Sequence, residues 1–94
     1  MTPEHIQDIL KICEATEGEG GFRELPQKTT LTLYLSKGGV GLTVASIEAI
    51  LPRGHTVQAR TNKGDLYVVS LEDVFAANVE GRMKSKSERR AGFG

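Results

Sequence analysis

The feature that most constrains this chain is an alternation of apolar and polar residues on both sides of a glycine pair. Every second residue from Leu31 to Leu35 is leucine, and every second residue from Val40 to Val44 is apolar. A period of two places the apolar side chains on one face of a β-strand. Glycine accepts the positive φ angles of a tight turn, so Lys37-Gly38-Gly39 predicts a hairpin with one leucine-rich face.

The apolar phase then shifts by one residue. Ile47, Ala49 and Leu51 are odd-numbered, whereas the apolar residues from Val40 to Val44 are even-numbered. One extra residue in a strand produces such a shift, so Ala45-Ser46 is predicted to form a β-bulge or bend. A short helix from Val44 to Leu51 is the alternative.

A second hairpin is predicted further along the chain. Pro52-Arg53-Gly54 indicates a turn, residues 55–61 alternate as a strand, and Asn62-Lys63-Gly64-Asp65 indicates a turn before a strand over residues 66–71. Ser70 is then predicted to cap one helical turn, with Asp73 completing a capping box. A last short strand covers residues 76–80.

The N-terminal segment has a helical pattern. Thr2 and Pro3 fit an N-cap followed by proline at the first helical position, which predicts a helix from Pro3 to Ala15. The glycine-rich stretch that follows is predicted to form a linker or an irregular segment before the next element. The apolar stripe of the helix is expected either to pack on its own domain or to contact a partner or second copy, and it consists of Ile6, Ile9, Leu10 and Cys13.

These patterns predict a mainly β fold with an N-terminal α-helix. Five short strands with a helical turn before the last are typical of a small Src-homology-3-like or Sm-like β-barrel, whose closure would satisfy the edge strands. With 94 residues the chain has room for one core. We divide it into an acidic helix and glycine linker (1–24), a barrel domain (25–80) and a basic tail (81–94).

Charge is segregated although the formal net charge is zero. Residues 1–24 carry six acidic and two basic residues, and residues 81–94 carry five basic residues and one acidic residue. Because this tail has few apolar residues to bury, it is expected to be disordered when it is not bound to a partner. It is also predicted to contact nucleic acid or an acidic partner, through Arg82, Lys84, Lys86, Arg89 and Arg90.

The glycine loop differs from a phosphate-binding loop at the decisive position. Residues 37–43 are similar to the deviant P-loop of the ParA/MinD ATPases, but Leu42 stands where that loop has its phosphate-binding lysine. Because leucine cannot neutralise phosphate charge, the glycines are interpreted as a turn.

No catalytic or metal-binding pattern emerges from the sequence. His5 and His55 have no further ligand at metal spacing, and Cys13 reads as a buried apolar residue. We therefore expect no enzymatic activity and no cofactor. A single cysteine and the lack of a long apolar run favour a cytoplasmic protein without membrane contact.

Residues 31–74 resemble the small flagellar FlbD (swarming-motility) family. The resemblance lies in an isoleucine-glutamate strand, a glycine hairpin and a tyrosine-valine strand, here Ile47-Glu48-Ala49-Ile50, Pro52, Thr56-Val57, Thr61-Asn62, Gly64, Tyr67-Val68-Val69 and Glu72-Asp73-Val74. It implies a shared small-sheet architecture.

The expected function is that of a non-enzymatic bacterial adaptor or regulator, a homo-oligomer that binds a protein through an exposed strand or barrel face. The alternative is a nucleic-acid-binding regulator in which the barrel positions the basic tail on phosphate. A third possibility is a head-to-tail assembly of the acidic first segment with the basic tail of another chain.

Overall fold

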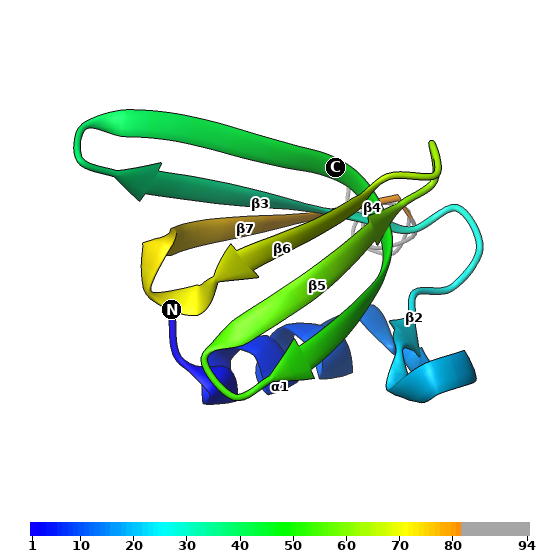
Figure 1. The fold of residues 1–94 in the computed structure, drawn as a ribbon. Helices are drawn as coiled ribbons and strands as arrows, with labels where there is room; N and C mark the ends of the chain where they lie inside the picture. Colours follow the sequence, from blue (N-terminus) through cyan, green and yellow to red (C-terminus); the bar gives the residue numbers. More distant parts are fainter. Residues whose placement is uncertain (82–94) are drawn as a thin grey trace, which may run out of the picture.

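The computed structural model describes residues 1–81, which form an antiparallel sheet beside one α-helix (Figure 1). The helix α1 spans Pro3–Cys13, and two 3₁₀ turns, η1 and η2, span Glu19–Gly21 and Leu71–Asp73. The strands are β1 (Thr16–Glu17), β2 (Arg23–Glu24), β3 (Thr30–Lys37), β4 (Val40–Arg53), β5 (Thr56–Thr61), β6 (Leu66–Ser70) and β7 (Val74–Glu80).

The predicted class, mainly β with one N-terminal helix, is confirmed, whereas barrel closure is not. Strands β1-β2-β4-β3-β7 lie in that order, β5 pairs with β4, and β6 pairs with β5. Within residues 1–81, β6 and β7 each have one paired edge only, so the hydrogen-bonded sheet is open. The sheet has seven strands, not the predicted five, because it also includes β1 and β2. Each of these two strands has only two residues, which is too short for an alternation of apolar and polar residues to be recognised in the sequence.

The first hairpin forms where the alternation predicts it. Gly38 and Gly39 have φ angles of 58° and 83°, and Lys37 pairs with Val40 across them. Two central residues with positive φ fit a type I′ turn, whose twist matches that of the flanking strands. The glycine motif therefore shapes a turn.

The predicted bulge is confirmed, and the alternative helix over Val44–Leu51 is wrong. Leu33 pairs with Val44 but Leu31 pairs with Ile47, so two residues of β4 stand opposite one residue of β3. Ser46 there has a φ of 61°. Beyond the bulge β4 leaves β3 and pairs with β5, so the two halves of one long strand serve different parts of the sheet (Figure 1).

The second hairpin is also confirmed, with small shifts at its ends. Its first strand begins at Thr56 rather than His55, because Gly54, with a φ of 63°, and His55 form the turn. In the next turn the Thr61 hydroxyl oxygen accepts hydrogen bonds from the backbone N–H groups of Lys63 and Asp65, at 3.3 and 3.2 Å. This side chain fixes the turn that precedes β6.

The helical turn before β7 is present, but its predicted cap is not. Residues Leu71–Asp73 form η2, and the Ser70 side chain makes no capping hydrogen bond. A three-residue 3₁₀ turn is too short for the capping box that the Ser70 and Asp73 spacing suggested.

Helix α1 begins with a reciprocal cap. The Thr2 hydroxyl oxygen accepts from the His5 N–H, and His5 Nδ1 accepts from the Thr2 N–H, both at 3.2 Å. The helix ends at Cys13, two residues before the predicted Ala15, because Glu14 has a left-handed φ of 60°. The Ala15 N–H donates to the Leu10 carbonyl at 3.0 Å, which closes the helix end.

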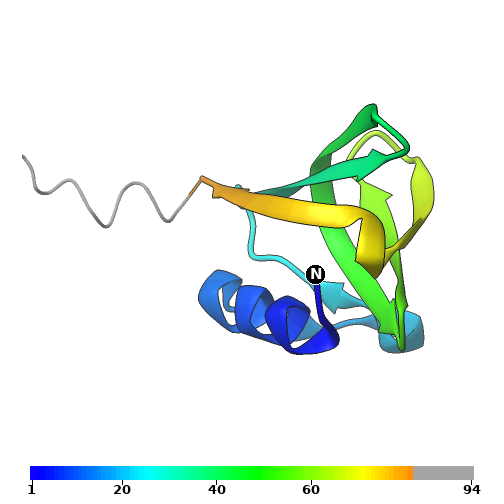
Figure 2. The same ribbon diagram turned by 90° about the vertical axis from the view of Figure 1, so that its left-hand side faces the viewer.

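The helix and the strands share one core. Ile6 and Leu10 are buried together with residues of β3, β4, β5 and η2, and α1 lies beneath the strands in both ribbon views (Figures 1 and 2). The Met1 ammonium group donates to the carbonyls of Leu71 and Val74, each at 2.9 Å. Residues 1–15 therefore pack into the same interior as the strands.

Candidate protein-binding site

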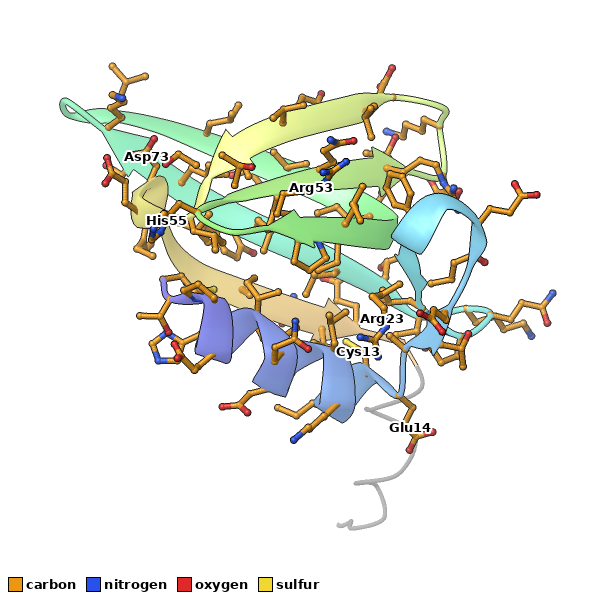
Figure 3. The ribbon with its side chains drawn as sticks, turned by 60° about the horizontal axis from the view of Figure 1, so that its bottom comes forward. Cys13, Glu14, Arg23, Arg53, His55 and Asp73 are labelled. Atoms are coloured by element: carbon orange, nitrogen blue, oxygen red, sulfur yellow. The ribbon has the colours of Figure 1, made fainter. Side chains whose placement is uncertain are left out.

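The apolar stripe of α1 faces the interior of the domain. Ile6, Leu10 and Cys13 are at most 1% exposed, and Ile9 is half-buried against the same core. Figure 3 shows the Cys13 side chain between α1 and the strands. Ile6, Leu10 and Cys13 thus pack on the chain's own domain, and within the stripe it is Ile9 that keeps part of its side chain exposed.

The predicted nucleic-acid or acidic-partner contacts lie outside the described residues. They are Arg82, Lys84, Lys86, Arg89 and Arg90, and all five follow Gly81, the last residue that the structure describes.

The outer part of the β3–β4 hairpin instead forms one wall of an apolar groove. We call Leu35–Leu42 the arm, because it extends past the remaining strands (Figure 1). The space between the arm, β6 and η2 has a volume of about 290 Å³. We call it the arm groove, and its lining residues are Leu35, Ser36, Lys37, Val40, Leu42, Val68, Val69, Ser70 and Asp73.

The arm groove exposes apolar side chains that a closed sheet would cover. Val40 is 71% exposed and Leu42 is 51% exposed, although they continue the inward alternation that buries Val44. Across the groove Val68 is 66% exposed. The arm keeps an uncovered inner face because β6 is five residues long and ends the sheet on this side. Exposed apolar side chains gathered at a groove mark an interaction site.

The backbone of β6 adds unpaired hydrogen-bonding groups along the groove. The Leu71 N–H donates to the His55 carbonyl at 2.8 Å, and the β5–β6 ladder continues from there in register. Antiparallel ladders alternate between bonded and non-bonded pairs. The N–H and C=O groups of Leu66, Val68 and Ser70 consequently point away from β5, toward the open edge.

This edge carries none of the usual protection. Strand edges are commonly shielded by lysine, proline or a bulge, yet Leu66–Ser70 contains no charged residue and no proline, and its pairing with β5 is regular. The charged residues in the lining of the groove are Lys37 of the arm and Asp73 of η2. Figure 3 shows Asp73 beside the outer end of the hairpin.

The neighbouring part of β4 is unpaired on the same side. Residues 40–44 pair with β3 only, since the pairing with β5 begins at Ile47. A smaller hollow of about 200 Å³ separates Thr43 and Ala45 from Tyr67. Two strands with open edges therefore border this side of the domain.

A polar hollow on another face is less suited to binding. It has a volume of about 300 Å³ and includes Arg60, Glu48 and Glu24 in its lining. The Arg60 guanidinium already pairs with both carboxylates, at 3.0 and 3.4 Å, and lies 5.4 Å from the centre of the Phe22 ring. These contacts connect β2, β4 and β5, so we assign this cluster a structural role.

Cys13 is a buried free cysteine. Burial raises the pKa of the Cys13 thiol, which disfavours the nucleophilic thiolate. Within residues 1–81 no group of three or more histidine, cysteine or acidic side chains is placed to hold a metal ion. In the same range no helix combines the length and apolar character needed to cross a membrane.

Comparison of the chain with protein-family models, curated proteins and solved structures gives no match. The resemblance to the FlbD family stays a prediction about architecture.

The arm groove was not predicted from the sequence, although two signals pointed to it. Residues 66–69 are all apolar or aromatic, Leu-Tyr-Val-Val, whereas a strand with one solvated face should alternate. The hairpin alternation also extends to Val40, beside the turn, where the core is too narrow to cover it. Neither pattern can be interpreted as a groove without knowing which strand lies at the edge of the sheet.

Proposed function

We propose that this chain is a non-enzymatic adaptor or regulatory module of the bacterial cytoplasm that binds a protein partner through the arm groove. The observation that carries the proposal is the unprotected edge of β6 beside exposed apolar side chains of the arm. A groove of this kind favours a protein over a small polar ligand, because it offers aliphatic surface and backbone groups but few charges.

The proposed architecture is that of an incomplete Src-homology-3-like or Sm-like barrel. The order of five main strands with a 3₁₀ turn before the last supports it, as does a long β4 whose halves pair with β3 and β5. In this interpretation the arm groove is the side on which the barrel lacks closure. A partner bound there would cover the exposed face of the arm.

Site-specific photo-crosslinking in the native host tests the proposal. A benzophenone amino acid at Val68 should capture a defined partner, whereas the same group at Ile12 is the matched control, because Ile12 is 51% exposed on the far face of α1. Adducts at Val68 that are absent at Ile12 support a groove-bound partner. Equal adducts at both positions, or none at Val68, would contradict it.

A further inference from the structure

We propose that the partner presents a short, extended and uncharged segment, which adds to β6 as one further strand beneath the arm. This inference rests on the proposed function and makes it specific. The site would recognise backbone hydrogen-bonding groups and alternating aliphatic side chains, as in binding by β-strand addition.

The backbone of β6 favours an extended occupant. Leu66, Val68 and Ser70 direct three N–H and three C=O groups toward the open edge, by the alternation described above. Only another strand matches such a row at the spacing of a ladder.

The arm favours a single added strand. Val40 and Leu42 lie on the inner face of the hairpin, and they share the groove with Val68 and Val69. A strand placed next to β6 would turn every second side chain toward this uncovered face. Small aliphatic side chains at those positions would bury Val40 and Leu42 as Val44 is already buried.

The size of the groove favours a short peptide segment as the occupant over a second folded copy of the chain. Nine residues line it, whereas a stable interface between folded proteins uses roughly 20–30 residues on each side. The lining includes one cation, Lys37, and one anion, Asp73. Because these two charges balance and the other lining residues are uncharged, the groove fits an uncharged peptide.

The substitution Val68→Pro should block pairing at the open edge of β6 while the domain stays folded. The Val68 N–H points away from β5, so Val68→Pro removes an edge donor and obstructs pairing without breaking the β5–β6 ladder. Val68→Thr keeps the donor and a β-branched side chain, which makes it the matched control. Val68→Lys is a second blocking variant, because Val68 is exposed and lysine is tolerated at a sheet edge.

The probe is a displayed library of random short peptides selected on the full chain. We expect enriched peptides with alternating aliphatic residues, which bind the wild type and Val68→Thr equally. Val68→Pro and Val68→Lys should each weaken binding by about tenfold or more, since one blocked edge disrupts several backbone hydrogen bonds. Urea unfolding of each variant checks that the domain remains folded.

Amide hydrogen exchange then identifies the mode of binding. A bound peptide should slow exchange at Leu66, Val68 and Ser70, whose N–H groups would become bonded. Binding that Val68→Lys removes without any change in exchange at these amides would overturn strand addition and leave the proposed function standing. Slowing that grows with the concentration of the free chain would show a second copy as the occupant and also overturn it.

The peptide selection tests strand addition, whereas the crosslinking at Val68 tests the proposed function, so a negative result in each experiment leads to a different conclusion. If no peptide distinguishes the wild type from Val68→Pro, the strand-addition inference is wrong, even where crosslinks at Val68 persist. Loss of the Val68 crosslinks as well would remove the proposed function too.

Discussion

Ser46 holds the bend in β4, and its backbone is the most constrained point of the strand. Its φ of 61° is a left-handed value that costs a residue with a β-carbon about 1–2 kcal/mol. The Ser46 carbonyl accepts a hydrogen bond from the Asn62 N–H at 2.9 Å, which ties the bulge to the turn before β6. The course of β4, and with it the arm, depends on this residue.

Substitutions at Ser46 should show this strain. Ser46→Val should destabilise the domain by about 1–2 kcal/mol, because β-branched residues strongly disfavour left-handed φ. Ser46→Gly should stay within about 0.5 kcal/mol of the wild type, since relief of strain offsets the added chain entropy. Urea unfolding measures both, with Thr43→Val, exposed in the same strand, as control. Equal loss for valine and glycine would contradict the strain.

Cys13 should make stability depend on alkaline pH. Burial raises the pKa of its thiol in the folded chain, while the thiol of the unfolded chain titrates near its usual value of about 8.5. The contribution of the neutral thiol is therefore complete below that pH, and it is lost as pH rises toward the folded pKa. The urea midpoint should fall more steeply with pH for the wild type than for Cys13→Ala. Parallel pH profiles would contradict this.

Helix α1 is held by its buried stripe and not by its own propensity, since an isolated helix of this length is marginal. Leu10→Ala should destabilise the domain by about 2–5 kcal/mol, because it leaves a cavity in the shared core. Ile12→Ala on the exposed face should change stability by less than about 0.5 kcal/mol. Chemical unfolding compares the pair. A small effect at Leu10 would mean that the helix does not share the core.

Local elements were predictable from the sequence because their determinants lie within a few residues. The Gly38-Gly39 turn and the bulge at Ala45-Ser46 both follow from local spacing. Barrel closure was not predictable, because it depends on how far apart the two edge strands β6 and β7 lie, which the alternation does not encode. The Ser70 cap failed because 3₁₀ geometry replaced the expected α-helical turn.

The candidate site could not be predicted from the sequence either, because it also depends on how the strands are arranged. The stripe of Ile6 and Leu10 has the pattern of either a core or an interface, and only the fold decides between them. Val40, Leu42 and Val68 resemble core residues in sequence. They are exposed because β6 ends the sheet before it can cover the arm.

At the scale of the molecule, the acidic first segment belongs to the folded domain, and the basic tail follows it. Deletion of residues 82–94 should change the free energy of unfolding by less than about 0.5 kcal/mol, because a sequence so rich in charged residues and so poor in apolar ones has little surface to bury. The same deletion should abolish a salt-sensitive gel shift if the tail binds nucleic acid. A gel shift that survives the deletion would rule out that role for the tail.

Amide hydrogen exchange of the free chain most directly tests whether β6 is an open edge. Exchange at Leu66, Val68 and Ser70 should be fast, while Tyr67, Val69 and Leu71, whose N–H groups face β5, should exchange more slowly. We expect alternating protection of this kind if β6 is an open edge. Uniformly slow exchange along residues 66–71 would show that the edge is already paired, and the arm groove would then be no binding site.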